Sequence, residues 1–194
     1  MVPDHIRALI FDCDGTLVDS MPLHMEAWEH ALSLQEAEWD YDFFFSRKGK
    51  REEDIVREYD EIFGSSLDPS HTLELKHEYF HARLDALRRI MRVVEVARRY
   101  RGLLPMSVAS GSTRETVTRQ LEALGLSGLF DLVITADDDV RPKPSPDIFL
   151  EAARRLGVAP EHCQVFEDGE LGLEAAHSAG MLATDIRLGL ADTD

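Results

Sequence analysis

The sequence is poor in cysteine. Only two of its 194 residues, Cys13 and Cys163, are cysteines. Two cysteines cannot form a disulfide framework, and by themselves they cannot make a zinc site built from thiolates. We therefore expect a protein of a reducing compartment, the cytoplasm.

Long apolar runs are also missing. No run approaches the roughly 20 apolar residues that span a bilayer. The first ten residues carry charges, and no small-residue cleavage site follows them. We therefore expect neither a membrane partner nor a signal peptide.

Basic residues are scarce relative to acidic ones. Lys and Arg number 21 against 37 Asp and Glu, so the formal net charge is −16. A surface that binds nucleic acid needs Lys and Arg to neutralise phosphates, so we expect no nucleic-acid partner. The charge favours a self-repelling protein, a monomer or a weak dimer. An anionic substrate would need a local cation to overcome this field.

Short apolar runs alternate with helical patterns along most of the chain. The runs are mostly continuous in apolar character and end in turn or charged residues, which is typical of strands buried on both faces. This alternation predicts an α/β fold, a Rossmann-like doubly wound parallel sheet. The expected strands cover residues 8–11, 104–109, 132–136, 164–166 and 182–186. The expected helices cover 114–124, 146–156 (with Ser145 as N-cap) and 170–179.

One segment interrupts this alternation. From about Val18 to Ile90 the pattern is helical, over 25–34, 52–63 and 73–90, and no strand is convincing. The simplest interpretation is a helical insertion after the first strand. We therefore predict an α/β core domain of residues 1–17 and 92–194 and a helical cap domain of residues 18–91.

Polar residues follow the predicted strands. In open α/β sheets, ligands bind at the carboxyl ends of the strands, so these residues are expected to meet at one edge. They are Asp12, Asp14, Ser110, Gly111, Ser112, Lys143, Glu167 and Asp168.

Four carboxylates among these residues favour a hard cation. Clustered carboxylates repel one another unless a cation binds or one of them holds a proton. Asp12, Asp14, Glu167 and Asp168 could provide oxygen ligands for Mg²⁺. If the strand continues, Asp12 and Asp14 point to one face. If the chain turns at Gly15, one of the two could ligate through its backbone carbonyl.

The remaining residues form an anion-binding pattern. Residues 110–113 follow a strand and open a helix, whose N-terminus offers free N–H groups and a positive dipole end. Gly111 allows a close approach of the backbone, and Lys143 is a compact positive charge suited to phosphate. Ser110 could also be no more than a helix N-cap, and Lys143 no more than a loop lysine.

Four ordered motifs carry a family resemblance. FDCDGTLVDS (11–20), SVASGST (107–113), RPKPSPDIF (141–149) and VFEDGELGLEAAHSAGM (165–181) resemble the motifs of the haloacid dehalogenase-like hydrolase superfamily. The chain is most similar to the branch with a small helical cap, that of β-phosphoglucomutase and fructose-1-phosphate phosphatase-like members. The resemblance implies the fold described above and Mg²⁺ as cofactor.

The resemblance also implies a role for each motif residue. Asp12 would be the nucleophile that forms an aspartyl-phosphate, and Asp14 the general acid and base. Asp14 would begin protonated, a state that burial and a neighbouring carboxylate favour. Ser110 and Lys143 would hold the phosphoryl oxygens. Asp12, the Asp14 carbonyl and Asp168 would bind Mg²⁺, with Glu167 as a further or outer ligand.

Cap residues are candidates for substrate contacts. His24 and Trp28 lie four apart, so they share one helix face and could line the pocket, although Trp28 could equally be a core residue. Lys48, Gly49, Lys50 and Arg51 could form a loop that reaches over the site, or a solvated basic turn.

The function expected from these residues is Mg²⁺-dependent hydrolysis of a small phosphorylated metabolite, a sugar phosphate. A phosphomutase of the β-phosphoglucomutase type would use the same core residues. A non-catalytic domain that binds phosphorylated metabolites is the alternative from a different class.

Overall fold

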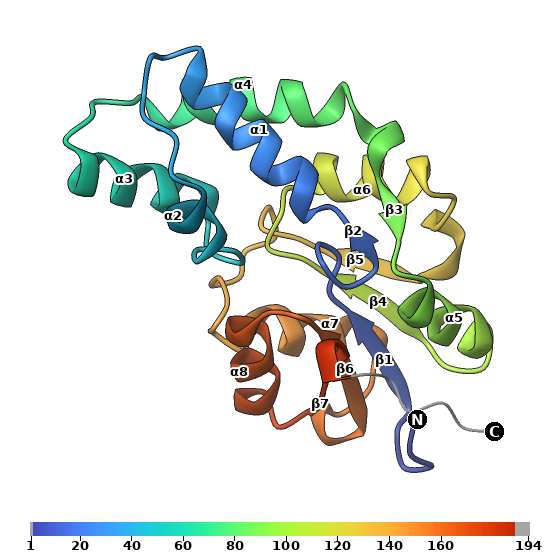
Figure 1. Cartoon of the computed structure of the whole chain (residues 1–194). Helices are drawn as coiled ribbons and strands as arrows, with labels where there is room; N and C mark the ends of the chain where they lie inside the picture. The colour runs from blue at the N-terminus through green and yellow to red at the C-terminus, as the bar shows by residue number, and fades with distance from the viewer. Residues whose placement is uncertain (1, 189–194) are drawn as a thin grey trace.

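A parallel five-stranded sheet forms the centre of the structure, a computed structural model that describes residues 2–188 (Figure 1). The strand order is β5–β4–β1–β6–β7, and every pairing is parallel. This confirms the predicted fold class. The strands are β1 (Ala8–Phe11), β4 (Met106–Ala109), β5 (Leu132–Ile134), β6 (Cys163–Glu167) and β7 (Leu182–Asp185).

Helices cover both faces of the sheet. Helices α5 (Met91–Tyr100) and α6 (Arg114–Ala123) share an apolar cluster with Leu9 and Phe11 of β1. Helices α7 (Asp147–Leu156) and α8 (Glu170–Ser178) share the other cluster with Ala8 and Ile10. Because successive side chains of a strand point to opposite faces, a strand covered on both sides must be apolar throughout.

The strand order reverses direction around β1. The chain passes from β1 to β4 and β5 on one side, and then crosses to β6 and β7 on the other. Such a switch point leaves a crevice at the carboxyl ends of the central strands, where doubly wound proteins bind ligands.

The segment between β1 and β4 is mainly helical. It contains α1 (Met21–Ser33), α2 (Tyr41–Phe45), α3 (Glu52–Phe63) and α4 (Pro69–His81), which gather beyond the end of β1 (Figure 1). Trp28, Phe44 and Tyr59 lie in an apolar cluster that these helices and the loops between them form, separate from the clusters at the sheet. We use the term cap helices for α1–α4 and cap loop for residues 46–51. The domain boundaries at 17/18 and 91/92 stay a prediction, and residues 1 and 189–194 of the predicted core lie outside the described part.

The expectation that residues 18–90 contain no strand was wrong. Strand β2 (Val18–Asp19) pairs antiparallel with β3 (Arg88–Arg89), so the chain leaves and re-enters the sheet region at one place. Two-residue strands are too short to produce a periodic pattern. The helix expected over 73–90 ends at His81, before a 3₁₀ turn at Leu84–Ala86 and β3.

Two further differences concern helices of the core. Helix α5 was not predicted, because its β-branched residues weaken the helical signal, although Val93, Val94 and Ala97 bury one face. Helix α7 begins at Asp147 with Pro146 at the N-cap, so Ser145 is not the N-cap. Its hydroxyl donates instead to Asp147 Oδ1 at 2.8 Å. The remaining 3₁₀ turns are Ser127–Leu129, Pro160–His162 and Ile186–Leu188.

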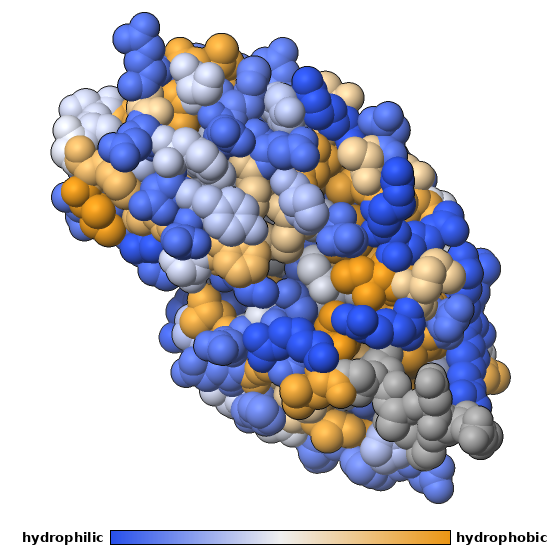
Figure 2. All heavy atoms as spheres, viewed as in Figure 1, coloured by the Kyte–Doolittle hydropathy of each residue, from blue (hydrophilic) through white to orange (hydrophobic). Residues whose placement is uncertain are grey.

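The surface is largely polar on the face that Figure 2 shows. Hydrophilic residues are spread over this face, and apolar residues form small patches between them. Among residues 2–188, no helix combines the length and the apolar character needed to cross a bilayer.

Candidate active site

The chain turns sharply after β1 and sends two acidic side chains in different directions. The carbonyl of Cys13 accepts hydrogen bonds from the backbone N–H groups of residues 16–18. Gly15 has φ +85°, and a Cβ there would lie 2.6 Å from Asp168 Oδ2. The site therefore needs glycine at this position for both conformation and space. Of the two geometries left open by the sequence, the turn is the one observed.

Asp12 forms a buried ion-pair triad. Lys143 Nζ donates to Asp12 Oδ1 and to Glu167 Oε2, both at 2.7 Å. Burial and the charge of Glu167 raise the pKa of Asp12, and Lys143 counteracts them only in part. Burial lowers the pKa of Lys143, but the two carboxylates outweigh it and raise that pKa above its usual value. Lys143 is thus a fixed positive charge at the end of β1.

Three acidic residues at the ends of β1 and β6 could hold a metal ion. One carboxylate oxygen from each of Asp12, Glu167 and Asp168 lies within 4.8 Å of the others. Asp12 Oδ2 is buried and has no hydrogen-bond partner among the described residues. An unpartnered carboxylate oxygen beside two further carboxylates is a donor set that fits Mg²⁺.

Small residues make room for these acids. Gly172, in the first turns of α8, lies so close to Glu167 that a Cβ would overlap its carboxylate. The backbone N–H of Gly169 donates to Glu167 Oε1 at 2.8 Å. Glu167 is therefore positioned by the start of α8 as well as by Lys143.

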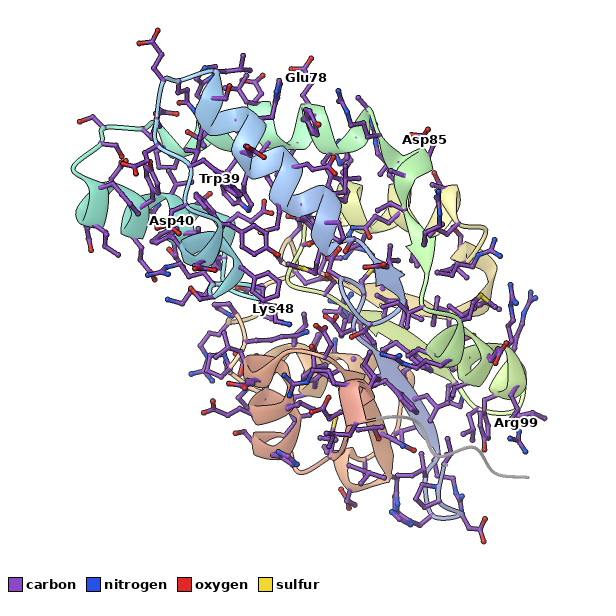
Figure 3. The ribbon with its side chains drawn as sticks, viewed as in Figure 1. Trp39, Asp40, Lys48, Glu78, Asp85 and Arg99 are labelled. Carbon is purple, nitrogen blue, oxygen red and sulfur yellow. The ribbon has the colours of Figure 1, made fainter. Side chains whose placement is uncertain are left out.

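Asp168 connects the core to the cap loop. Lys48 Nζ donates to Asp168 Oδ2 at 3.0 Å, and Thr16 Oγ1 donates to Asp168 Oδ1 at 3.2 Å. Lys48 lies where the cap helices meet the core (Figure 3). A Cβ built on Gly111 would lie 3.8 Å from Gly49 O, so the cap loop also passes over the loop after β4.

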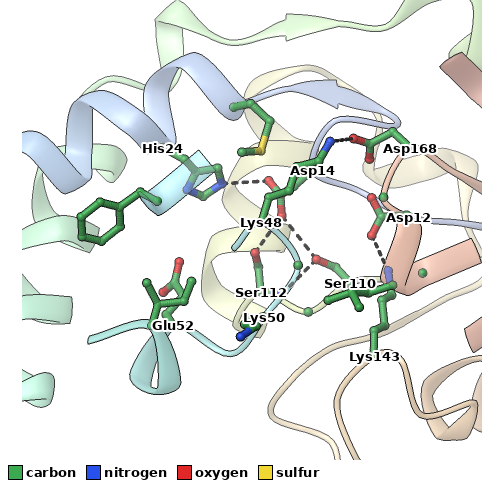
Figure 4. A pocket seen from close by; sticks show the side chains of 18 of the residues that line it. Asp12, Asp14, His24, Lys48, Lys50, Glu52, Ser110, Ser112, Lys143 and Asp168 are labelled. Carbon is green, nitrogen blue, oxygen red and sulfur yellow. Dashed lines mark hydrogen bonds and ion pairs between the residues drawn. The ribbon is translucent and has the colours of Figure 1, made fainter. Parts of the chain in front are cut away.

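Asp14 points away from the acid cluster, into a group of hydrogen-bond donors (Figure 4). Oδ1 accepts from Ser20 Oγ at 2.7 Å and from Gln120 Nε2 at 2.9 Å, and His24 Nε2 lies 3.1 Å away. Oδ2 accepts from Ser112 Oγ at 2.7 Å. The Asp14 side chain is therefore not part of the metal-binding cluster.

The expectation that burial and a neighbouring carboxylate keep Asp14 protonated was wrong. Burial raises the pKa of Asp14, but the charge of His24 and the hydrogen bonds from His24, Ser112 and Ser20 outweigh it. The pKa of Asp14 therefore lies well below its usual range. Donors surround this carboxylate, whereas the repelling carboxylates surround Asp12.

The loop after β4 presents hydroxyls to the site. Ser110 Oγ lies 3.4 Å from Asp14 Oδ2 and accepts from the Ser112 backbone N–H at 3.1 Å. The N-cap of α6 is Thr113, whose side chain accepts from the Thr116 N–H. Ser110 is therefore not a helix N-cap.

One pocket brings most of the predicted residues together. His24 and Trp28 line it from α1, Lys48 and Gly49 from the cap loop, and Arg51 lies beside a smaller neighbouring pocket. Trp28 combines both expected roles, because it also packs on Phe44 at 4.8 Å between ring centroids. The predicted core residues that line this pocket are Asp12, Asp14, Ser110, Gly111, Ser112, Lys143, Glu167 and Asp168.

Lys50 of the expected basic loop lines the pocket, whereas Gln120 and Glu52 were not predicted. Gln120 is a buried polar residue on the apolar face of α6, which was a usable signal. Glu52 lines the pocket from α3. No motif marks these two residues, because their contacts come from residues far away in the sequence.

Comparisons with known proteins show the family of the chain. Residues 6–180 match the sequence model of a family described as haloacid dehalogenase-like hydrolase. The chain is similar to fructose-1-phosphate phosphatase YqaB of Escherichia coli (strain K12), with 37% identity over 185 residues, 95% of this chain and 98% of the relative. It is 30% identical to a phosphorylated carbohydrates phosphatase of Thermotoga maritima, over 91% of this chain and 82% of that protein. The solved β-phosphoglucomutase of Clostridium difficile superposes with a TM-score of 0.80 at 26% identity, over 93% of this chain and 84% of that one.

Proposed function

The chain belongs to the haloacid dehalogenase-like hydrolases, and we propose that it hydrolyses a small phosphorylated metabolite, a sugar phosphate, through an aspartyl-phosphate on Asp12. The observation that carries this proposal is the buried Asp12 carboxylate, which has an oxygen without a hydrogen-bond partner among the described residues. That oxygen lies between a lysine and two further acids, in a pocket that also contains serine hydroxyls.

In the proposed first step, Asp12 acts as the nucleophile. One oxygen of its carboxylate attacks phosphorus, the bond from phosphorus to the sugar oxygen breaks, and the leaving oxygen takes a proton from Asp14. Lys143 and the loop of residues 110–112 hold the phosphoryl oxygens and stabilise the charge that they carry. In the second step, water attacks the phosphorus of the aspartyl-phosphate and Asp14 accepts its proton. The bond from phosphorus to Asp12 breaks, so inorganic phosphate leaves and the Asp12 carboxylate is restored.

Asp14 needs a proton for the first step, although its surroundings favour the charged form. A dianionic phosphate beside Ser112 would raise the pKa of Asp14 through like-charge repulsion, and would compete for the hydroxyl donor. His24 lies 3.1 Å from Asp14 Oδ1, close enough to exchange a proton with it. Substrate binding is thus expected to convert Asp14 into the acid.

Mg²⁺ is the proposed cofactor, with Asp12, Asp168 and the Asp14 carbonyl as its protein ligands. Glu167, which also pairs with Lys143, would be a further or outer ligand. When bound, it supplies positive charge that favours ionised Asp12 and neutralises the phosphoryl group. The same charge explains how an anion can enter a protein of net charge −16.

Asp12→Asn tests the nucleophile. We expect the variant to lose Mg²⁺-dependent release of phosphate from p-nitrophenyl phosphate by at least about 1,000-fold, since a neutral amide cannot form the acyl phosphate. The control is Asp19→Asn, a solvent-exposed residue of β2. Comparable turnover in Asp12→Asn and the wild type would exclude Asp12 as the nucleophile. Absence of Mg²⁺-dependent turnover in the wild type, for a broad panel of phosphoesters, would favour a binding domain.

A phosphomutase is the second candidate, because the β-phosphoglucomutase of Clostridium difficile shares the fold at 26% identity. A mutase returns the phosphoryl group to a reoriented sugar, whereas a phosphatase transfers it to water. Product analysis with glucose 1-phosphate and a bisphosphate primer distinguishes the two. A cytoplasmic location stays part of the proposal, supported by two free buried cysteines. A monomer or weak dimer also stays part of it, on the net charge of −16.

A further inference from the structure

Glu52 is a pocket carboxylate that phosphoryl transfer does not require. It is the first residue of α3 and lines the pocket together with the catalytic acids. In Figure 4 it lies across the pocket from Asp12 and Asp168, on the side of the cap helices. A ligand with its phosphate at Asp12 would therefore extend towards Glu52.

Two residues of α4 hold the Glu52 carboxylate in its charged form. Lys76 Nζ pairs with Oε1, and His77 Nε2 lies 2.6 Å from Oε2. Burial raises the pKa of Glu52, but the charge of Lys76 and the contacts of His77 outweigh it and lower that pKa below its usual value. Glu52 is consequently an anion at neutral pH.

The partner of Glu52 is hidden from a ligand. Lys76 is only 1% exposed, and its ammonium lies 5.3 Å from the centre of the Trp28 ring. Lys76 is not among the described residues that line the pocket, whereas Glu52 is. A ligand therefore meets the carboxylate and not the ammonium.

The other cations of the pocket already have acidic partners. Lys143 pairs with Asp12 and Glu167, and Lys48 pairs with Asp168. Lys50 pairs with Glu58, outside the pocket. His24, the remaining basic residue that lines the pocket within residues 2–188, contacts Asp14. A second anionic group of a ligand would therefore find no unpaired cation on the Glu52 side of the pocket, among the described residues.

Apolar side chains surround Glu52. Trp28, Phe44 and Ile55 line the same side of the pocket, from α1, α2 and α3. Apolar walls around one strong acceptor suit a molecule with C–H faces and hydroxyl donors. Each carboxylate oxygen can accept more than one hydrogen bond, so Glu52 can bind hydroxyls while it stays paired with α4.

We infer that Glu52 is a specificity-determining residue that selects phosphate monoesters of neutral polyhydroxy compounds and rejects substrates with a second phosphate. This inference rests on the proposed function and specifies its substrate class. Hydroxyls of the substrate donate to Glu52, whereas a second phosphate would face a fixed negative charge. A mutase must hold a bisphosphate in this space, so the same residue favours hydrolysis over return of the phosphoryl group to the sugar.

The first experiment compares three substrates with the wild-type enzyme and Mg²⁺. We expect kcat/KM for fructose 1-phosphate to exceed that for fructose 1,6-bisphosphate by at least about tenfold. The reason is that the second phosphate of the bisphosphate would lie near the Glu52 carboxylate without a cation to pair with. p-Nitrophenyl phosphate has no hydroxyl to donate to Glu52, so its turnover measures phosphoryl transfer without this contact. Its Mg²⁺-dependent turnover tests the proposed function separately from the inference.

The second experiment neutralises Glu52. In Glu52→Gln we expect kcat/KM for fructose 1-phosphate to fall by about 10- to 100-fold, and turnover of p-nitrophenyl phosphate to stay within about twofold. The ratio of kcat/KM for fructose 1,6-bisphosphate to kcat/KM for fructose 1-phosphate should rise by about tenfold or more, since Lys76 loses its counterion. Glu53→Gln is the matched control, because this neighbouring carboxylate pairs with Arg57 on the exposed side of α3.

Loss of the ion pair could unfold the cap helices, so a double variant accompanies the single one. Glu52→Gln with Lys76→Met removes both charges together, and we expect it to fold and to show the same selective loss for fructose 1-phosphate. The inference is overturned if the wild type hydrolyses both fructose phosphates equally well. It is also overturned if the folded variants lose turnover of fructose 1-phosphate and p-nitrophenyl phosphate to the same extent.

Discussion

Asp12 and Asp14 are two residues apart, and their pKa values are shifted in opposite directions. The pKa of Asp12 is raised by burial and by Glu167, whereas donors around Asp14 overcome burial and lower its pKa. The proposed reaction needs the reverse, an ionised Asp12 and a protonated Asp14. A divalent cation favours the first and a dianionic phosphate favours the second. The site is therefore expected to reach its reactive protonation state only with both ligands.

The depressed pKa of Asp14 predicts a pH-dependent contribution to stability. The unfolded chain titrates near the ordinary value of 3.8, and the folded chain binds this proton more weakly. The stabilisation by Asp14 is therefore present above about pH 4 and is lost as the pH falls below it. Asp14→Asn should cost about 1–3 kcal/mol in urea unfolding at pH 7, and the difference should shrink towards pH 3.

Glu61→Gln is the control for this series, because Glu61 is an exposed residue of α3. We expect it to change the unfolding free energy by less than about 0.5 kcal/mol at either pH. A cost of Asp14→Asn that is constant from pH 7 to pH 3 would contradict the assignment of Asp14 as a carboxylate stabilised by donors.

The site residues that directly follow strands could be predicted from the sequence. Asp12, Ser110 and Asp168 each follow an apolar strand, and parallel strands end at the same edge, so their meeting could be predicted. The protonation state of Asp14 could not be predicted, because Gln120 and His24 contact its carboxylate from two separate helices. Glu52 was missed for the same reason, since Lys76 lies 24 residues away.

Among the elements, the strands of the parallel sheet were the most predictable, because their short apolar runs end in turn or charged residues. The predicted bounds of β1 match the structure, and those of β5, β6 and β7 differ by two residues or fewer at either end. Helix α5 and the pair β2–β3 were missed, because β-branched residues and two-residue strands give ambiguous or no periodicity. The short helix α2 has only five residues and depends on tertiary packing for its stability.

Helix α2 offers a matched test of that packing. Phe44 is 2% exposed and contacts the rings of Trp28, Trp39 and Tyr59, whereas Phe45 is 41% exposed. Phe44→Ala should therefore cost about 3–5 kcal/mol in urea unfolding, and Phe45→Ala less than about 1 kcal/mol. Equal costs for the two variants would show that the cap helices do not form a packed core around Phe44.

At the scale of the whole molecule, acids from distant parts of the chain converge. Asp12 lies at the end of β1 and Asp168 lies after β6, and these strands are neighbours in the sheet. Folding therefore brings like charges together, within a chain of net charge −16. A divalent cation that binds only the folded state should relieve this repulsion and stabilise the protein.

This predicts a rise of the melting temperature with MgCl₂. At 100 times the Kd, binding adds about 2.7 kcal/mol, which for a chain of this size raises the Tm by about 5–10 °C. Asp168→Asn should lose most of the rise in differential scanning fluorimetry. Asp147→Asn should keep it, because Asp147 pairs with Arg141 outside the pocket. Equal rises in all three proteins would exclude the proposed metal ligands.

The pairing of β2 with β3 has a consequence for how this enzyme could be modified. Val18 lies opposite Arg89 and Asp19 opposite Arg88, so the ends of the intervening helical stretch are adjacent. Such a stretch can be exchanged for the corresponding piece of a relative without altering the distance that the scaffold must bridge. We expect chimeras joined at this ribbon to inherit the donor's choice of sugar and to retain the recipient's hydrolytic chemistry.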